Sequence, residues 1–242
     1  MQEILSDLVA EEQALDQFLQ RVPIREWKSN IPGQSWTIQD TVSYLALGEE
    51  LAHAALEGHA HPSLDGHSYE VLREASAARG RAMRPQDVIE WWRHERAAVV
   101  DALSRLGEDD TVVWFDDKVT AKAFASSRLA DTWSHGLDIH AAMSTDVEDT
   151  PRLRHIAWLS WETLPIAFSD AGEPYSDPVR VEVIGANYAK WVFGPPDTDQ
   201  LIKGRAAEWC RVAARRMDAS KTSLQVSGET AQRALEVARV QV

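Results

Sequence analysis

The sequence contains little cysteine, which limits its covalent and redox chemistry. Cys210 is the only cysteine among 242 residues, so no intramolecular disulfide can form and nothing indicates an oxidising compartment. Cys210 lies in the apolar-rich stretch AAEWCRVAA, which favours a buried structural thiol over a nucleophile.

The chain also lacks a recognisable leader and any long apolar run. Its N-terminal stretch, MQEILSDLVAEEQ, is acidic and has neither the basic nor the apolar region of a signal peptide. No apolar run approaches the roughly 20 residues that a membrane helix needs. We therefore expect a cytoplasmic protein without a membrane partner.

Positive charge is scarce. The chain has 25 basic and 38 acidic residues, a net charge of −13, and such a surface repels nucleic-acid phosphates. No phosphate-binding glycine loop, G-x-S-x-G, C-x-x-C or H-E-x-x-H motif is present. The apolar fraction of 44% is that of an ordinary globular protein.

What the sequence does contain is helical periodicity over its first 172 residues. Thr37 followed by Asp40 resembles a capping box at the start of a helix. Residues 107–120 are expected to form a turn and a short apolar piece. The spacing of apolar residues predicts helices over 2–22, 38–56, 69–80, 85–106, 121–143 and 151–168.

The pattern changes after Gly172. PVRVEVIG (178–185) alternates as a strand does, and YAKWVFG (188–194) follows after two residues, which predicts a hairpin. Further strands are expected over 198–203 and 222–228, and helices over 205–217 and 229–239. We therefore expect two domains, a helical bundle over 1–172 and a small α+β domain over 173–242.

The strongest polar cluster lies in DTWSHGLDIH (131–140). At about 100° per residue, Asp131, His135 and Asp138 fall on one helix face, with Trp133 and His140 opposite. A carboxylate four residues before a histidine can share a metal with it or fix its tautomer. The alternative is a solvated acidic stripe that contains a histidine.

A second cluster consists of four histidines in a short segment, His53, His59, His61 and His67, with Asp65 nearby. Together they could bind a metal. A solvated loop is the favoured interpretation, because no regular helix or strand presets their geometry.

Two of these stretches, with the C-terminal region, are similar to a known family. WTIQDTVSYLALGEE (36–50) and RLADTWSHGLDIHAAM (128–143) resemble two motifs of the mycothiol-dependent maleylpyruvate isomerase-like proteins of the DinB superfamily. The C-terminal part resembles that family's small domain. The resemblance implies a mainly α fold, a DinB-like four-helix bundle followed by a small α+β sterol-carrier-like domain.

The resemblance also implies a metal site, with departures from the family pattern. Family members use a divalent metal to activate a thiol, typically mycothiol, or water. The three ligand positions correspond to Tyr44, Asp131 and His135, where the family has His, Glu and His. Only His135 matches, and a neutral phenol is a poor zinc ligand because its pKa is about 10. These departures favour a site without a catalytic metal, although zinc or mycothiol stays possible.

Three functions follow from these residues. The favoured one is a small-molecule enzyme of isomerase or cyclase type, acting by proton transfer on an apolar or aromatic substrate through His135, Asp131, Tyr44 and Asp138. The second is a mycothiol- and divalent-metal-dependent isomerase or S-transferase. The third is a non-catalytic small-molecule-binding protein in which Tyr44 plugs the former site. We expect a monomer or a homodimer.

Overall fold

A computed structural model describes residues 1–59, 69–115 and 117–240. The chain divides into two compact units, Met1–Val147 and Glu148–Val242, which are described separately below. Among the described residues, no helix is long and apolar enough to cross a membrane.

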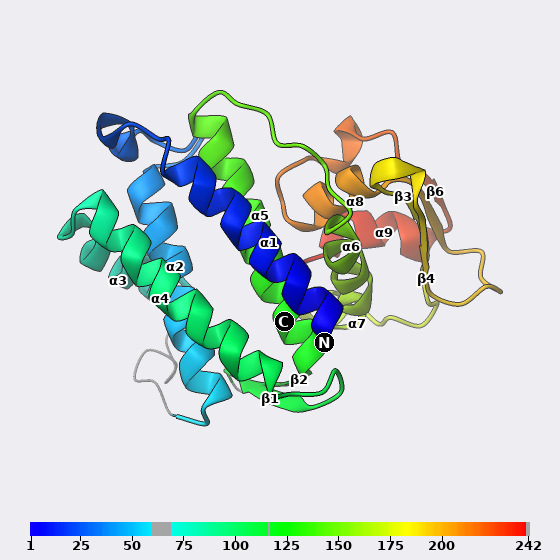
Figure 1. Ribbon diagram of the computed structural model, residues 1–242. Coiled ribbons are helices and arrows are strands. Elements are labelled where there is room, and N and C mark those ends of the chain that lie inside the picture. The colour runs from blue at the N-terminus through cyan, green and yellow to red at the C-terminus, as the bar shows by residue number, and fades with distance from the viewer. Residues whose placement is uncertain (60–68, 116, 241–242) are drawn as a thin grey trace. The chain divides into compact units, whose positions relative to one another are not determined.

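The first unit is a bundle of long helices (Figure 1), which confirms the mainly α prediction. Helix α1 contacts α4 and α5, and α2 contacts both of these helices as well as α3. A short 3₁₀ helix, η1 (Ile24–Lys28), follows α1. The helices are α1 (Gln2–Leu19), α2 (Ile38–Leu56), α3 (Tyr69–Arg81), α4 (Pro85–Ser104) and α5 (Ala121–Ala142).

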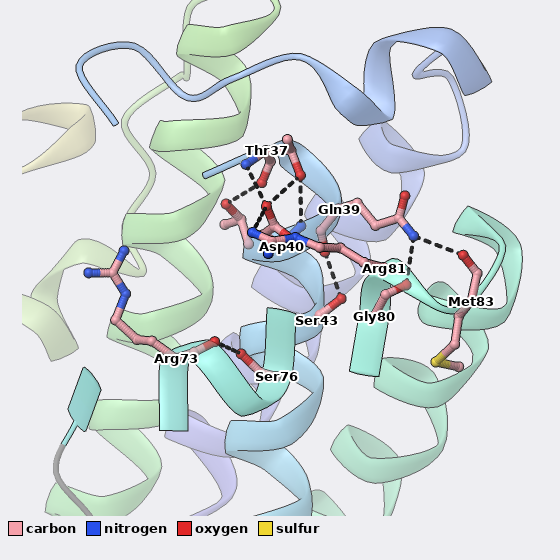
Figure 2. Close-up of polar contacts among 10 residues, drawn as sticks. Thr37, Gln39, Asp40, Ser43, Arg73, Ser76, Gly80, Arg81 and Met83 are labelled. Carbon is pink, nitrogen blue, oxygen red and sulfur yellow. Dashed lines mark hydrogen bonds and ion pairs between the residues drawn. The ribbon is translucent and has the colours of Figure 1, made fainter. Parts of the chain in front are cut away.

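The predicted capping box does start α2 (Figure 2). The Thr37 hydroxyl accepts a hydrogen bond from the Asp40 amide at 3.2 Å, and the Asp40 carboxylate accepts one from the Thr37 amide at 3.0 Å. Asp40 is fully buried and also accepts two hydrogen bonds from Arg81, at 2.8 and 3.1 Å. One carboxylate therefore both begins α2 and ties it to the end of α3.

Helices α2 and α3 also approach each other closely (Figure 2). The Gln39 side chain donates to the carbonyl of Gly80 in the last turn of α3, at 2.8 Å, and to that of Met83 just after the helix, at 2.9 Å. A Cβ at Gly80 would lie 1.7 Å from the Ser43 hydroxyl oxygen, so any side chain there would push the helices apart. This junction fixes the orientation of the first two turns of α2.

A two-stranded hairpin precedes α5, where the sequence predicts only a turn and an apolar piece. Strands β1 (Thr111–Trp114) and β2 (Asp117–Thr120) pair antiparallel. Trp114 is buried and packs edge-on against Phe124 of α5, with ring centroids 5.2 Å apart. Thr120 then caps α5 by accepting from the Ala123 amide at 3.1 Å.

The second unit is built on a four-stranded mixed sheet of order β4-β3-β5-β6. Strand β3 pairs antiparallel with β4 and parallel with β5, and β5 pairs antiparallel with β6, so the predicted hairpin is present. The strands are β3 (Arg180–Ile184), β4 (Lys190–Phe193), β5 (Leu201–Arg205) and β6 (Gln225–Ser227). The helices are α6 (Leu153–Glu162), α7 (Leu164–Asp170), α8 (Ala206–Ala213) and α9 (Glu229–Val237).

One feature of this unit differs from expectation. The single helix predicted over 151–168 is broken at Thr163, because Pro165 begins a new helix and cannot continue the old one. Helix α6 packs on α8 and α7 packs on α9, and by its contacts the chain divides into compact units at Val147–Glu148, while the domain boundary at residue 172 stays a prediction.

The thiol of Cys210 is inaccessible. Its side chain is fully buried and lies 3.6 Å from the Leu153 carbonyl, and burial raises the pKa of the thiol far above its usual range. This agrees with a structural role.

Candidate functional site

The structure brings Tyr44 and His135 together from two helices of the bundle. Tyr44 lies on α2 and His135 on α5, and their ring centroids are 5.0 Å apart in an edge-to-face arrangement. Tyr44 also packs against the buried Trp36, with ring centroids 5.7 Å apart, and the Arg73 guanidinium lies over Trp36 at 3.9 Å. One wall beside His135 is therefore aromatic.

His135 is held by one of its neighbouring carboxylates. Its Nδ1 lies 3.3 Å from a carboxylate oxygen of Asp138, and both side chains are about one-tenth exposed. Such a carboxylate orients the ring and leaves Nε2 as the nitrogen directed elsewhere. Asp138 thus stands in the orienting position.

The other carboxylate, Asp131, is paired with a residue that the sequence does not single out. A guanidinium nitrogen of Arg128 lies 2.8 Å from Asp131, and another lies 3.9 Å from the carboxylate of Glu49 on α2. Burial lowers the pKa of Arg128, but Asp131, Glu49 and Tyr44 outweigh it and the net shift is upward. The guanidinium is therefore a permanent positive charge inside the bundle.

His140 has a different environment, as expected for the opposite face. It stacks on Phe18 of α1 with ring centroids 3.7 Å apart, and its Nδ1 lies 2.9 Å from the Thr145 hydroxyl. Burial lowers its pKa. This arrangement is explained by packing.

Two further acids lie in the bundle interior. Burial, with Asp131 and Glu95, raises the pKa of Glu49 to about 7 against the opposing effect of Arg128 and Arg96. Burial and the neighbouring Glu49 raise the pKa of Glu12 on α1 to about 9. Both shifts favour the protonated carboxyl group in the folded protein.

The interior also contains buried polar atoms that have no hydrogen-bond partner. Both carboxylate oxygens of Glu49 and one of Glu12 are in this state among the described residues. So are the ring nitrogen of Trp92, the hydroxyls of Ser126 and Thr132, and Nε of Arg128. Such atoms are costly to bury unless water or a ligand reaches them. The interior of the bundle therefore has polar atoms that could form hydrogen bonds with water or with a polar ligand.

The sequence does carry a signal for these residues. Glu49 continues the buried stripe of Val42 and Leu45, and Glu12 lies between Leu8 and Leu15. A charge at a core position of an amphipathic helix is unfavourable unless it has a use. That rule is the sequence signal for Glu49, and for Glu11 or Glu12, which have equivalent spacing to Leu8 and Leu15.

The donor set at the implied metal position does not fit a tightly held zinc ion. Asp131 is engaged by Arg128, and the third position is the phenol of Tyr44. Within residues 1–59, 69–115 and 117–240, no group of three or more His, Cys, Asp or Glu could hold a metal.

Of the histidine-rich segment, His53 lies 3.8 Å from Glu95, while His61, Asp65 and His67 lie outside the described residues.

The fold and this site define a helical-bundle protein of DinB type with a polar interior site and a small α+β unit. Residues 8–140 match the family model of the mycothiol maleylpyruvate isomerase N-terminal domain, and the chain belongs to that family. It is also 29% identical over 240 residues to uncharacterized proteins from two strains of Mycobacterium tuberculosis, covering 97% of this chain and 93% of theirs.

Two solved structures share the fold. The crystal structure of the mycothiol-dependent maleylpyruvate isomerase matches with a TM-score of 0.61 and 19% identity over 90% of each chain. A histidine-to-alanine mutant of that enzyme matches with a TM-score of 0.60 and 18% identity over 89% of each chain.

Proposed function

We propose that this chain is an isomerase-type enzyme that moves a proton on a small apolar or aromatic molecule, with His135 as the catalytic residue. The observation that carries the proposal is the meeting of His135 and Tyr44 across α2 and α5, with Asp138 against Nδ1 of His135. Family membership supports a reaction of isomerase type.

In the proposed reaction, Nε2 of His135 removes a proton from a carbon next to a carbonyl group. The electron pair of the broken C–H bond moves onto the carbonyl oxygen, and the proton returns to a different position on the carbon skeleton. Asp138 stabilises the imidazolium that forms. The Tyr44 hydroxyl donates to the substrate, while Asp131 holds the positive charge of Arg128 close to the developing negative charge.

Solvent exchange tests this reaction even when the product has not been identified. Carbonyl compounds, including maleylpyruvate, are incubated with the protein in deuterated water, and loss of C–H signals is followed by proton NMR. We expect exchange with the unaltered protein and about 10²–10⁴-fold slower exchange with His135→Ala. His140→Ala is the matched control and should exchange at the normal rate.

Equal exchange by His135→Ala and the unaltered protein would refute the assignment. Binding of compounds without exchange would favour a non-catalytic binding protein.

A second function, dependent on mycothiol and a divalent metal, is favoured by membership of a family that is named for mycothiol. Zinc content separates it from the first. Protein purified without a histidine tag should hold clearly less than one equivalent of zinc. Tyr44→His together with Asp131→Glu should bind zinc about tenfold or more tightly in competition with a chelator, because the pair restores an imidazole and a longer carboxylate arm. One tightly bound equivalent in the unaltered protein would favour the metal-dependent reaction.

A further inference from the structure

The sheet of the second unit contains a crevice at its parallel pair of strands. The chain leaving β3 turns to β4 on one side, whereas the chain leaving β5 passes through α8 to β6 on the other. Ile184 and Arg205, the last residues of β3 and β5, are paired. Connections that diverge from the carboxyl ends of neighbouring parallel strands leave a crevice, and ligands of open α/β sheets bind in such crevices.

A cavity of about 370 Å³ occupies this position. Its lining comes from the connection after β3, through Gly185, Asn187 and Tyr188, and from Arg205 and Ala207 after β5. Leu153 of α6 adds an apolar side chain to the lining. A cavity of this size is large enough for a small organic molecule.

The cavity carries an available positive charge. The Arg205 guanidinium is exposed and has no hydrogen bond or ion pair among the residues that the structure describes. The one acid in the lining, Asp149, is paired with Arg211 at 2.9 Å. The local balance is therefore positive in a chain whose net charge is −13.

The rest of the lining is suited to a flat apolar group. Tyr188 is 93% exposed, and Ile184 beside it is 43% exposed. Asn187 and Tyr188 both have positive φ, 56° and 59°, a backbone conformation that side-chain-bearing residues adopt at a cost. Tyr188 therefore lines the cavity with its side chain open to solvent.

We propose that this cavity binds a small aromatic carboxylate, with the carboxylate on Arg205 and the ring against Tyr188. This site lies wholly within the second unit and does not depend on the function proposed for the bundle. Arg205 supplies a two-pronged donor for the carboxylate, and the Asn187 amide adds a polar contact.

Phenylacetate is a suitable probe, and NMR titration of the ¹⁵N-labelled full chain measures its binding. We expect saturable shifts at Gly185, Asn187 and Arg205 below about 10 mM phenylacetate, the range suited to so few contacts. Arg205→Gln should weaken binding about tenfold. Lys203→Gln, which removes an equal charge from the same strand outside the cavity, should leave binding unchanged.

Two further binding experiments locate the site and define the chemistry of its ligand. His135→Ala should bind phenylacetate normally, which separates this cavity from the bundle site. Neutral phenylacetamide and inorganic phosphate should both bind at least severalfold more weakly. Phenylacetamide lacks the negative charge that Arg205 would bind, and phosphate lacks the aromatic ring that would pack against Tyr188. Absence of shifts with phenylacetate, equal binding by Arg205→Gln and Lys203→Gln, or loss of binding in His135→Ala would overturn the proposal.

Discussion

The two units of this chain differ in how many of their buried polar groups lack hydrogen bonds. In the second unit the buried hydroxyls of Ser160 and Thr163 and the ring nitrogen of Trp209 all donate to backbone carbonyls, at 2.7 to 3.1 Å. In the bundle, Glu12, Glu49, Trp92, Arg128 and others hold buried atoms that make no hydrogen bond. A core whose polar groups are satisfied serves stability, whereas unsatisfied groups in a native interior indicate a use.

The largest effect should come from the packed core of the second unit. Trp209 is fully buried and donates to the Ala157 carbonyl at 3.1 Å. Trp209→Ala should lower the stability of this unit by about 3–5 kcal/mol, through lost burial and the cavity that remains. Hydrogen exchange of the β3 and α8 amides measures the change. Tyr188→Ala, at an exposed ring, should change stability by less than about 0.5 kcal/mol. Equal stability losses in Trp209→Ala and Tyr188→Ala would show that the buried polar contact of Trp209 does not stabilise this unit.

A somewhat smaller effect should follow in the bundle from removing its buried cation. Arg128→Met leaves Asp131 and Glu49 without their guanidinium and should cost about 3 kcal/mol by urea denaturation. Adding Glu49→Leu should recover much of this loss, because the double variant no longer has a buried Glu49 carboxyl group without a neighbouring positive charge. If the double variant were less stable by the sum of the two single effects, Arg128 and Glu49 would not act as a pair.

The smallest effect concerns Glu12 and pH. Its carboxyl is protonated in both states below its ordinary pKa of 4.5, so burial then has no ionisation cost. Between 4.5 and about 9 the unfolded chain loses this proton while the folded chain keeps it, so stability falls as pH rises. Glu12→Gln lacks this titration.

Glu12→Gln should therefore gain stability over the unaltered protein as pH rises through that window, by at most about 1.4 kcal/mol for each pH unit, and should gain little at pH 4. Urea denaturation at several pH values measures the difference. Glu3→Gln, an exposed position on the same helix, should give a flat difference. A flat difference for Glu12→Gln as well would show that its environment does not penalise the charge.

Much of the fold can be predicted from the sequence, because periodicity and capping are local. The helical spacing predicts α2 over the residues that the structure gives it, and Thr37 and Asp40 make the predicted contacts. The break at Thr163 also has a sequence signal, since Pro165 stands within the predicted helix. The hairpin β1–β2 gives no clear signal because each strand has only four residues.

The site can be predicted only in part. The helical repeat places Asp131, His135 and Asp138 on one face, but it cannot tell which carboxylate meets His135 and which meets Arg128. Nor does it give the contact with Tyr44, since the distance between two helices depends on their packing. The division between units has no local signal either, because the association of α6 with α8 is a tertiary contact.

Asp40 has a consequence for how sequences of this kind are sorted. Its carboxylate is fully occupied in starting α2 and holding Arg81 (Figure 2), so any chain that builds this helix junction has a reason to keep it, whatever reaction it performs. Searching sequence collections for W-T-x-x-D therefore selects chains that share this helix junction, and does not select them by the reaction that they perform. Grouping the retrieved chains by the residue four positions later, which is Tyr44 here, would divide them by chemistry.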